Sequence, residues 1–132
     1  MKRNKKMKVL VVEDDSLFLW SLGQFLKREG YEVSSAMTAE LAFDMAQKQP
    51  FDIVISDFHL PGLNGKELIK RVRALYPVIK TVLISAYQKE ETGGDDESLL
   101  NAYLNKPIEL GNLKRLLQNL TAKTALAEAH RP

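Results

Sequence analysis

The chain has 132 residues, enough for one hydrophobic core and too few for two, because domains commonly run from about 100 to 150 residues. Hydrophobic residues make up 45% and charged residues 27%, a balance that excludes a disordered or membrane-embedded chain. The net charge is +2, but five of the 19 basic residues precede every acid, which leaves 14 basic against 17 acidic groups in the rest. This mildly acidic body argues against direct nucleic-acid binding by this chain, since phosphate contacts need clustered Lys and Arg.

The sequence also lacks the signals of export and membrane insertion. No stretch approaches the roughly 18 apolar residues of a membrane span, and Glu13 interrupts the first apolar run. The absence of cysteine excludes a disulfide framework and a thiolate metal site. We expect a cytoplasmic protein with a basic tail over residues 1–7, one folded domain over 8–122, and a helical extension or the start of a linker over 123–132.

Short runs rich in β-branched residues alternate along the chain with longer stretches of helical period. The predicted strands are residues 8–12, 31–36, 52–56, 81–85 and 102–105. The first, third and fourth are almost continuously apolar, which is typical of strands covered on both faces. The alternation predicts an α/β fold with a parallel sheet and helices on both of its faces.

Four helices are predicted from capping residues and apolar spacing. The first begins near Asp15 or Ser16, the second after a Thr38 cap, the third after an Asn64 cap, and the last near Glu109. The apolar positions expected to face the sheet are Phe18, Leu22, Phe25, Leu26, Leu68, Val72, Leu75, Leu110, Leu113, Leu117 and Leu120.

The segment between the fourth and fifth predicted strands differs from the helical segments between the other strands. Residues 88–98 include no strongly apolar side chain, and two adjacent glycines precede three consecutive acids. Such a segment cannot anchor a helix to the sheet by burial. In this position, the fourth of five helical segments along the chain, we expect a helix that is short, near residues 98–101, or disordered.

Polar side chains gather where the predicted strands end. They are Glu13, Asp14 and Asp15 after the first strand, Asp57 after the third, Ser85 at the end of the fourth and Lys106 after the fifth. In an open parallel sheet, ligands bind outside the carboxyl ends of the strands, near the point where strand order reverses. The sequence therefore predicts that these four loops meet over one pocket.

The chemistry of that set is suited to a phosphoryl group. Carboxylates in close proximity raise one another's pKa unless a cation is present. Mg²⁺ is such a cation, and it prefers oxygen ligands, which Asp14 and Asp57 could supply. Lys106 is a cation that could offset charge on phosphoryl oxygens. The Ser85 hydroxyl and the Ala86 N–H could bond another oxygen, but only when a phosphoryl group is present.

Four motifs carry a resemblance to a known family: VLVVEDD, DIVISDFHLPGLNG, VLISAY and YLNKP, in this order at the ends of predicted strands. The chain resembles the response-regulator receiver domains, the family of the chemotaxis protein CheY. The resemblance implies a flavodoxin-like three-layer sandwich whose five-stranded parallel sheet has the order 2-1-3-4-5. It implies a receiver domain over residues 8–122 and not an enzyme, with at most slow self-dephosphorylation. Its partners would be a sensor histidine kinase or phosphotransfer protein, and an unknown downstream protein or missing output domain.

The resemblance also assigns roles around a magnesium ion. It implies that Asp57 is the phosphoacceptor and that Glu13 and Asp14 form the acidic pair, while Asp15 lies outside it. Capping preferences indicate that Asp15 or Ser16 caps a helix instead. Mg²⁺ would be held directly by Asp14, Asp57 and the backbone carbonyl of His59, and through water by Glu13.

Three further residues receive a role from the resemblance. Lys106 corresponds to the lysine that contacts the phosphoryl group, and the peptide bond from it to Pro107 is expected to be cis. Ser85 is the hydroxyl switch, and Tyr103 is an aromatic switch that moves inward with it. For Tyr103 the alternative is a half-buried core aromatic.

Other interpretations compete for the same residues. A Mg²⁺-dependent phosphohydrolase would also use a nucleophile such as Asp57, but those enzymes place a second acid where this chain has His59. A receiver-like interaction module that is never phosphorylated is the other alternative. The His59 side chain is expected at the rim of the pocket, where with Tyr87 it would restrict attacking water; a transition-metal site is disfavoured because no second nitrogen or sulfur ligand is close in sequence.

Overall fold

The computed structural model describes residues 6–86 and 102–129, with side chains up to residue 122. It contains five strands, β1 (Lys8–Val12), β2 (Glu32–Ala36), β3 (Ile53–Asp57), β4 (Lys80–Ser85) and β5 (Ala102–Asn105). They form one parallel sheet of order β2-β1-β3-β4-β5, which confirms the predicted topology. Tyr87, the acidic segment 88–98 and the short helix expected near 98–101 lie outside the described residues.

The register of the sheet brings the strand ends together. Val12 of β1 pairs with Ser56 of β3, so the next residues, Glu13 and Asp57, lie side by side. Asp57 pairs with Ile84 of β4, which places Ser85 one residue further along the same edge. Because Ser85 in turn pairs with Asn105 of β5, the residue after β5, Lys106, follows at this edge as well.

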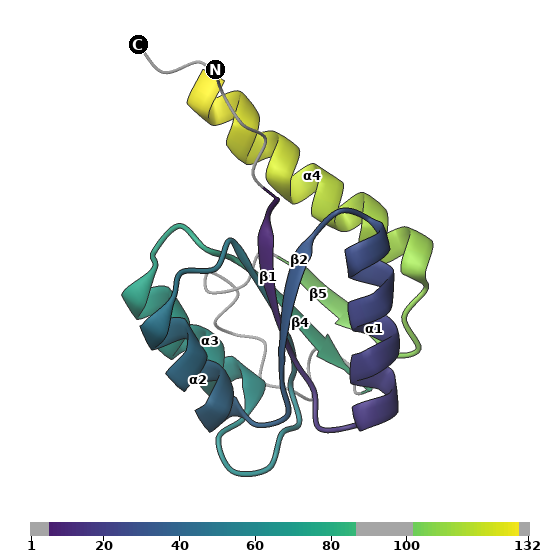
Figure 1. Ribbon diagram of the computed structural model, residues 1–132, viewed down its shortest axis with the longest axis vertical. Coiled ribbons are helices and arrows are strands. Elements are labelled where there is room, and N and C mark those ends of the chain that lie inside the picture. The colour runs from purple at the N-terminus through teal and green to yellow at the C-terminus, as the bar shows by residue number, and fades with distance from the viewer. Residues whose placement is uncertain (1–5, 87–101, 130–132) are drawn as a thin grey trace.

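Helices cover both faces of the sheet (Figure 1). They are α1 (Ser16–Arg28), α2 (Ala39–Lys48), α3 (Gly65–Leu75) and α4 (Leu110–Ala129). Helices α1 and α4 pack on one face, and α2 and α3 pack on the other, which gives the expected three layers.

Side-chain oxygens cap the first three helices, as predicted. Asp15 accepts hydrogen bonds from the Leu17 and Phe18 N–H groups. Thr38 and Asn64 each accept one from the N–H group three residues later, at 3.1 and 2.9 Å. Each cap satisfies a donor that the helix itself leaves without a partner.

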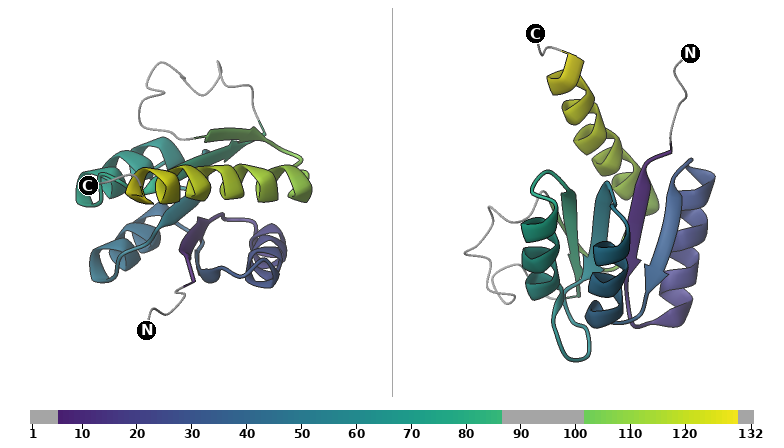
Figure 2. Two further views of the ribbon diagram at one scale, coloured as in Figure 1. Left: turned by 90° about the horizontal axis from the view of Figure 1, so that it is seen from above. Right: turned by 60° about the vertical axis from the view of Figure 1, so that its left-hand side comes forward.

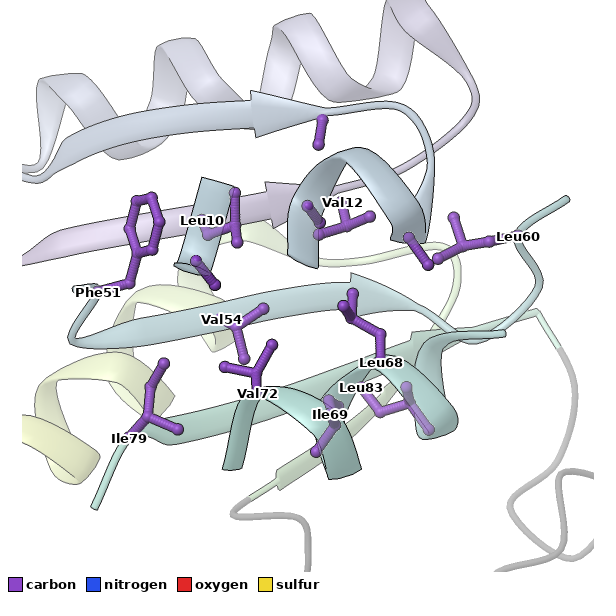
Figure 3. Packing of buried hydrophobic residues seen from close by; sticks show 14 residues of the cluster. Leu10, Val12, Phe51, Val54, Leu60, Leu68, Ile69, Val72, Ile79 and Leu83 are labelled. Carbon is purple, nitrogen blue, oxygen red and sulfur yellow. The ribbon is translucent and has the colours of Figure 1, made fainter. Parts of the chain in front are cut away.

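Alternate residues of each strand point to opposite faces, and this splits the core into two clusters. On the side of α2 and α3, the strand residues pack against Leu68, Ile69 and Val72 (Figure 3). Buried strand residues in this first cluster are Leu10, Val12, Ala36, Val54 and Leu83; those in the second, beneath α1 and α4, are Val9, Val11, Ile53, Ile55, Val82 and Ile84.

Some predicted core positions differ from the structure. Leu75 and Leu110 are 41% and 40% exposed, so their predicted burial is wrong. Leu75 is the last residue of α3, and Leu110 is the first residue of α4. A side chain at a helix terminus is flanked by helical neighbours on one side only, and it is therefore less covered. Ile69, in the middle of α3, is buried beside its neighbours instead. Phe18 and Phe25 are only half-buried, at the edge of the second cluster.

Helix α4 is longer than the sheet that it covers. It continues to Ala129, and its second half projects past the amino ends of the strands (Figure 2). Among the side chains of α4 that the structure describes, the buried ones are Leu113 and Leu117, both in the first half of the helix. Among the described residues, neither α4 nor any other helix combines the length and apolar character needed to cross a membrane.

Candidate functional site

A buried ion-pair cluster lies at the carboxyl edge of the sheet. The Lys106 ammonium nitrogen is 2.8 Å from Glu13 Oε1 and 3.3 Å from Asp57 Oδ2. Glu13 and Asp57 are only 2% and 7% exposed, whereas the lysine side chain is 25% exposed. The sequence places these residues in three separate loops, and the fold joins them as predicted.

Asp14 completes a cluster of three carboxylates. One oxygen each from Glu13, Asp14 and Asp57 lie within 4.8 Å of one another, with Asp14 on the exposed side. Closely spaced carboxylate oxygens are ligands suited to a hard divalent cation such as Mg²⁺. The residues present therefore fit the metal that the sequence predicts.

Glu13 is engaged through both of its oxygens. Oε1 accepts a hydrogen bond from Lys106, and Oε2 accepts one from the Asp15 N–H at 3.0 Å. Burial raises the pKa of Glu13, and the charge of Asp57 raises it further, while the bonds from Lys106 and Asp15 oppose this. Burial lowers the pKa of Lys106, but the hydrogen bond that it donates to Glu13 and the charge of Asp57 outweigh this effect, so that the pKa of Lys106 lies above its ordinary value. The ammonium thus stays charged at neutral pH.

Two hydrogen bonds fix the backbone at Asp57 and at the residue after it, Phe58. The Ser56 hydroxyl donates to the Asp57 carbonyl oxygen at 2.9 Å, and the Gly65 N–H donates to the Phe58 carbonyl oxygen at 2.8 Å. A β-carbon at Gly65 would lie 2.1 Å from the Asp57 carbonyl oxygen, so only glycine allows α3 to begin this close. Gly65 ends the second sequence motif, but the motif alone does not indicate this function.

His59 is exposed beside the acidic cluster. Its N–H donates a long hydrogen bond, 3.4 Å, to Asp57 Oδ1, and its ring meets the Phe58 ring edge to face at 4.8 Å between centroids. The expectation that His59 and Tyr87 restrict attacking water stays a prediction, and Tyr87 lies outside the described residues.

An aromatic ring also contacts the lysine. The Lys106 ammonium nitrogen is 4.8 Å from the centroid of the Phe18 ring, in the first turn of α1. Sequence reasoning treated Phe18 as a core position only. Phe18 lies four residues after Asp14, which places it near the acidic pair in sequence. This spacing alone does not show that the loop after β5, with Lys106, faces the Phe18 ring.

With this geometry in place, comparison with known proteins identifies the family. The sequence model of the response regulator receiver domain matches residues 9–118. The chain belongs to this family.

Curated relatives contain such a receiver domain within longer chains. The transcriptional regulatory protein ZraR of Escherichia coli strain K12 is 32% identical over 127 residues, which are 94% of this chain and 28% of that protein. The response regulator protein FleR of Pseudomonas aeruginosa is 34% identical over 122 residues, 92% of this chain and 25% of that protein. The chain thus spans about a quarter of the length of these curated relatives.

Solved receiver domains share the whole fold. A CheY-like receiver domain from Methanospirillum hungatei JF-1 superposes with a TM-score of 0.83 at 28% identity, covering 92% of this chain and 98% of that one. The response regulator TrrA from Thermotoga maritima, solved in complex with Mg²⁺-BeF, gives 0.79 at 27% identity, covering 86% and 98%. These likenesses confirm a phosphoacceptor module of two-component signalling and disfavour the phosphohydrolase hypothesis.

The remaining receiver residues named from the sequence occupy the expected elements. Ser85 is fully buried at the end of β4, and its carbonyl oxygen accepts a hydrogen bond from the Lys106 N–H at 2.8 Å. Tyr103 in β5 is half-buried against the first core cluster. The Lys106–Pro107 peptide bond is cis, as the resemblance implies. The switching movements assigned to Ser85 and Tyr103 stay predictions.

Proposed function

We propose that this receiver domain accepts a phosphoryl group on Asp57 from a sensor histidine kinase or a phosphotransfer protein, with Mg²⁺ bound beside it. The observation that carries the proposal is the buried Asp57 carboxylate, which lies 3.3 Å from the Lys106 ammonium within a cluster of three acids. A carboxylate next to a fixed cation and a metal site has what phosphoryl transfer requires, namely positioning and charge stabilisation.

Among the three acids, Asp57 is best suited to be the nucleophile. Both oxygens of Glu13 accept short hydrogen bonds, of 2.8 and 3.0 Å, whereas the contacts to the Asp57 oxygens are longer, at 3.3 and 3.4 Å. Asp14 is exposed at the side of the cluster. In the proposed step a carboxylate oxygen of Asp57 attacks the phosphorus atom. The bond from phosphorus to the donor nitrogen breaks, and its electron pair leaves with the donor imidazole. The product is an acyl phosphate on Asp57.

The metal would be held by the ligands that the family resemblance implies. Asp14 and Asp57 would bind Mg²⁺ through carboxylate oxygens, and His59 through its backbone carbonyl. The engagement of both Glu13 oxygens supports a contact through water for that residue. When bound, Mg²⁺ offsets negative charge on the phosphoryl oxygens.

The output would be a shift between two states of the receiver surface. The phosphoryl group adds negative charge at the carboxyl edge, which favours the state that places Lys106 and the Ser85 hydroxyl against it. Tyr103 would follow Ser85 inward, and a downstream protein or an attached output domain would bind the changed surface. A cytoplasmic location is part of this proposal, since a histidine kinase or phosphotransfer protein would have to meet the domain there.

Intact-mass measurement after incubation with acetyl phosphate and Mg²⁺ tests the proposal. We expect the mass increase of one phosphoryl group in the wild-type chain and no increase in Asp57→Asn. Asp52→Asn is the matched control, because Asp52 precedes β3, at the opposite end from Asp57, and is exposed there. An unmodified wild-type chain would overturn the proposal and favour the interaction module that is never phosphorylated. Phosphorylation that persists in Asp57→Asn would overturn the choice of acceptor.

A further inference from the structure

The ring of Phe18 occupies a fixed place beside the site cation. Phe18 is the third residue of α1, and its N–H donates to the cap residue Asp15 at 3.2 Å. The cap follows directly after the acidic pair, so the ring is attached to the same loop that carries Glu13 and Asp14. Its centroid lies 4.8 Å from the Lys106 ammonium nitrogen.

Among the described residues, the ammonium therefore has neighbours of two kinds, carboxylates and an aromatic ring. Glu13 and Asp57 contact it through carboxylate oxygens at 2.8 and 3.3 Å, and Phe18 presents the face of its ring. An aromatic face is electron-rich and attracts a cation within about 6 Å of its centroid. A lysine side chain has a long flexible stem, so contacts at its tip decide where the charge resides.

The contacts of Asp57 and Phe18 with Lys106 respond differently to phosphorylation. Once Asp57 becomes an acyl phosphate, its carboxylate no longer carries the charge that attracts Lys106, and the ammonium must turn toward a phosphoryl oxygen. The ring of Phe18 neither gains nor loses charge in this step. It can thus attract the ammonium before, during and after the transfer.

We propose that Phe18 is a positioning residue that holds the Lys106 ammonium over the pocket during phosphoryl transfer. This inference rests on the function proposed above. The competing explanation is that Phe18 only packs against the second core cluster, in which it is one of several half-buried side chains.

Phe25 supplies a matched control for packing. It is also a phenylalanine of α1, lies two turns further along the helix, and is half-buried against the same cluster. Phe18→Leu and Phe25→Leu each remove a ring and keep an apolar side chain, but only the first removes the contact with Lys106. Acetyl phosphate serves as donor, because a small donor makes no contact with the outer surface of α1.

We expect Phe18→Leu to slow phosphorylation of Asp57 by about fivefold, the change that corresponds to about 1 kcal/mol of cation–π attraction. Phe25→Leu should stay within about twofold of the wild type, and Phe18→Trp should retain the rate, since Trp gives the strongest cation–π contact.

Replacement of Phe18 by phenylalanines with one, two and three ring fluorines should lower the rate stepwise, because fluorine withdraws electrons from the ring face at little change in volume. Equal effects of the two leucine variants, or no dependence on fluorine, would overturn the inference.

A proton NMR measurement distinguishes failure of the proposed role of Phe18 from failure of the proposed function. The ring current of Phe18 should shift the Lys106 Cε protons upfield in the wild type, and the shift should vanish in Phe18→Leu. Absence of the shift in the wild type overturns the inference while phosphorylation of Asp57 still supports the proposed function. If the shift is present but the wild-type chain accepts no phosphoryl group, the proposed function fails and the positioning role fails with it.

Discussion

Gly65 offers the sharpest test of how closely the site is packed. In Gly65→Ala the added β-carbon would lie 2.1 Å from the Asp57 carbonyl oxygen and 2.9 Å from Ser56 Oγ. Ordinary van der Waals contacts begin at 3.4 Å, so α3 and the end of β3 must separate by about 1.3 Å. The obstacle is backbone, which cannot rotate away as the tip of a flexible side chain can.

The expected loss follows from three contributions. Overpacking of this kind costs about 1–3 kcal/mol, and a shift of this size also breaks the 2.8 Å hydrogen bond from the Gly65 N–H to the Phe58 carbonyl oxygen, worth about 1 kcal/mol. The greater helix propensity of alanine returns up to about 1 kcal/mol. We therefore expect Gly65→Ala to lower the free energy of unfolding by about 2 kcal/mol, which still leaves a typical domain folded.

Gly23→Ala is the matched control, because Gly23 is also a buried helical glycine. Its added β-carbon would meet Val33 at 3.8 Å and Ser35 at 4.0 Å, both ordinary contacts. We expect this variant to gain about 0.5–1 kcal/mol, the usual advantage of Ala over Gly inside a helix.

Urea unfolding followed by far-ultraviolet circular dichroism measures both changes. The single tryptophan, Trp20, is 64% exposed and would report unfolding poorly by fluorescence. If Gly65→Ala were as stable as the wild type, or if both variants changed stability in the same direction, the close approach of α3 to Asp57 would be refuted.

Three further predictions concern the fold and the metal. Tyr76→Phe removes a hydroxyl that donates to the Ala46 carbonyl oxygen at 2.6 Å, so urea unfolding should show a loss of about 1 kcal/mol; an unchanged midpoint would contradict this. Asn64→Ala removes the cap of α3 and should cost about 1 kcal/mol in the same assay, whereas Asn64→Asp should keep the cap and the stability. Mg²⁺ at ten times its dissociation constant should stabilise the wild type by about 1.4 kcal/mol in thermal unfolding, and Asp14→Asn should lose that gain; an equal gain in the variant would exclude Asp14 as a ligand.

Much of the fold was predictable because its signals are local. The five strands are short runs of β-branched and apolar residues, and the predicted boundaries are within one residue of the observed ones. The helix caps Asp15, Thr38 and Asn64 were also predictable, since a cap bonds an N–H group only two or three residues away.

Prediction failed where exposure depends on distant neighbours. Leu75 and Leu110 have the spacing of core residues, yet they stand at helix ends and are exposed. The periodicity of a sequence gives the direction of a side chain, but not whether another element extends far enough to cover it.

The set of site residues was predictable, and their contacts were not. Four motifs in order indicated that Glu13, Asp57 and Lys106 share a pocket, because the carboxyl ends of parallel strands meet at one edge. Tertiary structure decided that the ammonium bonds both carboxylates, that the ring of Phe18 faces it, and that α3 begins against the Asp57 carbonyl. The two ion pairs join residues 93 and 49 positions apart. Contacts across such separations depend on strand register and helix placement, which the whole core determines together.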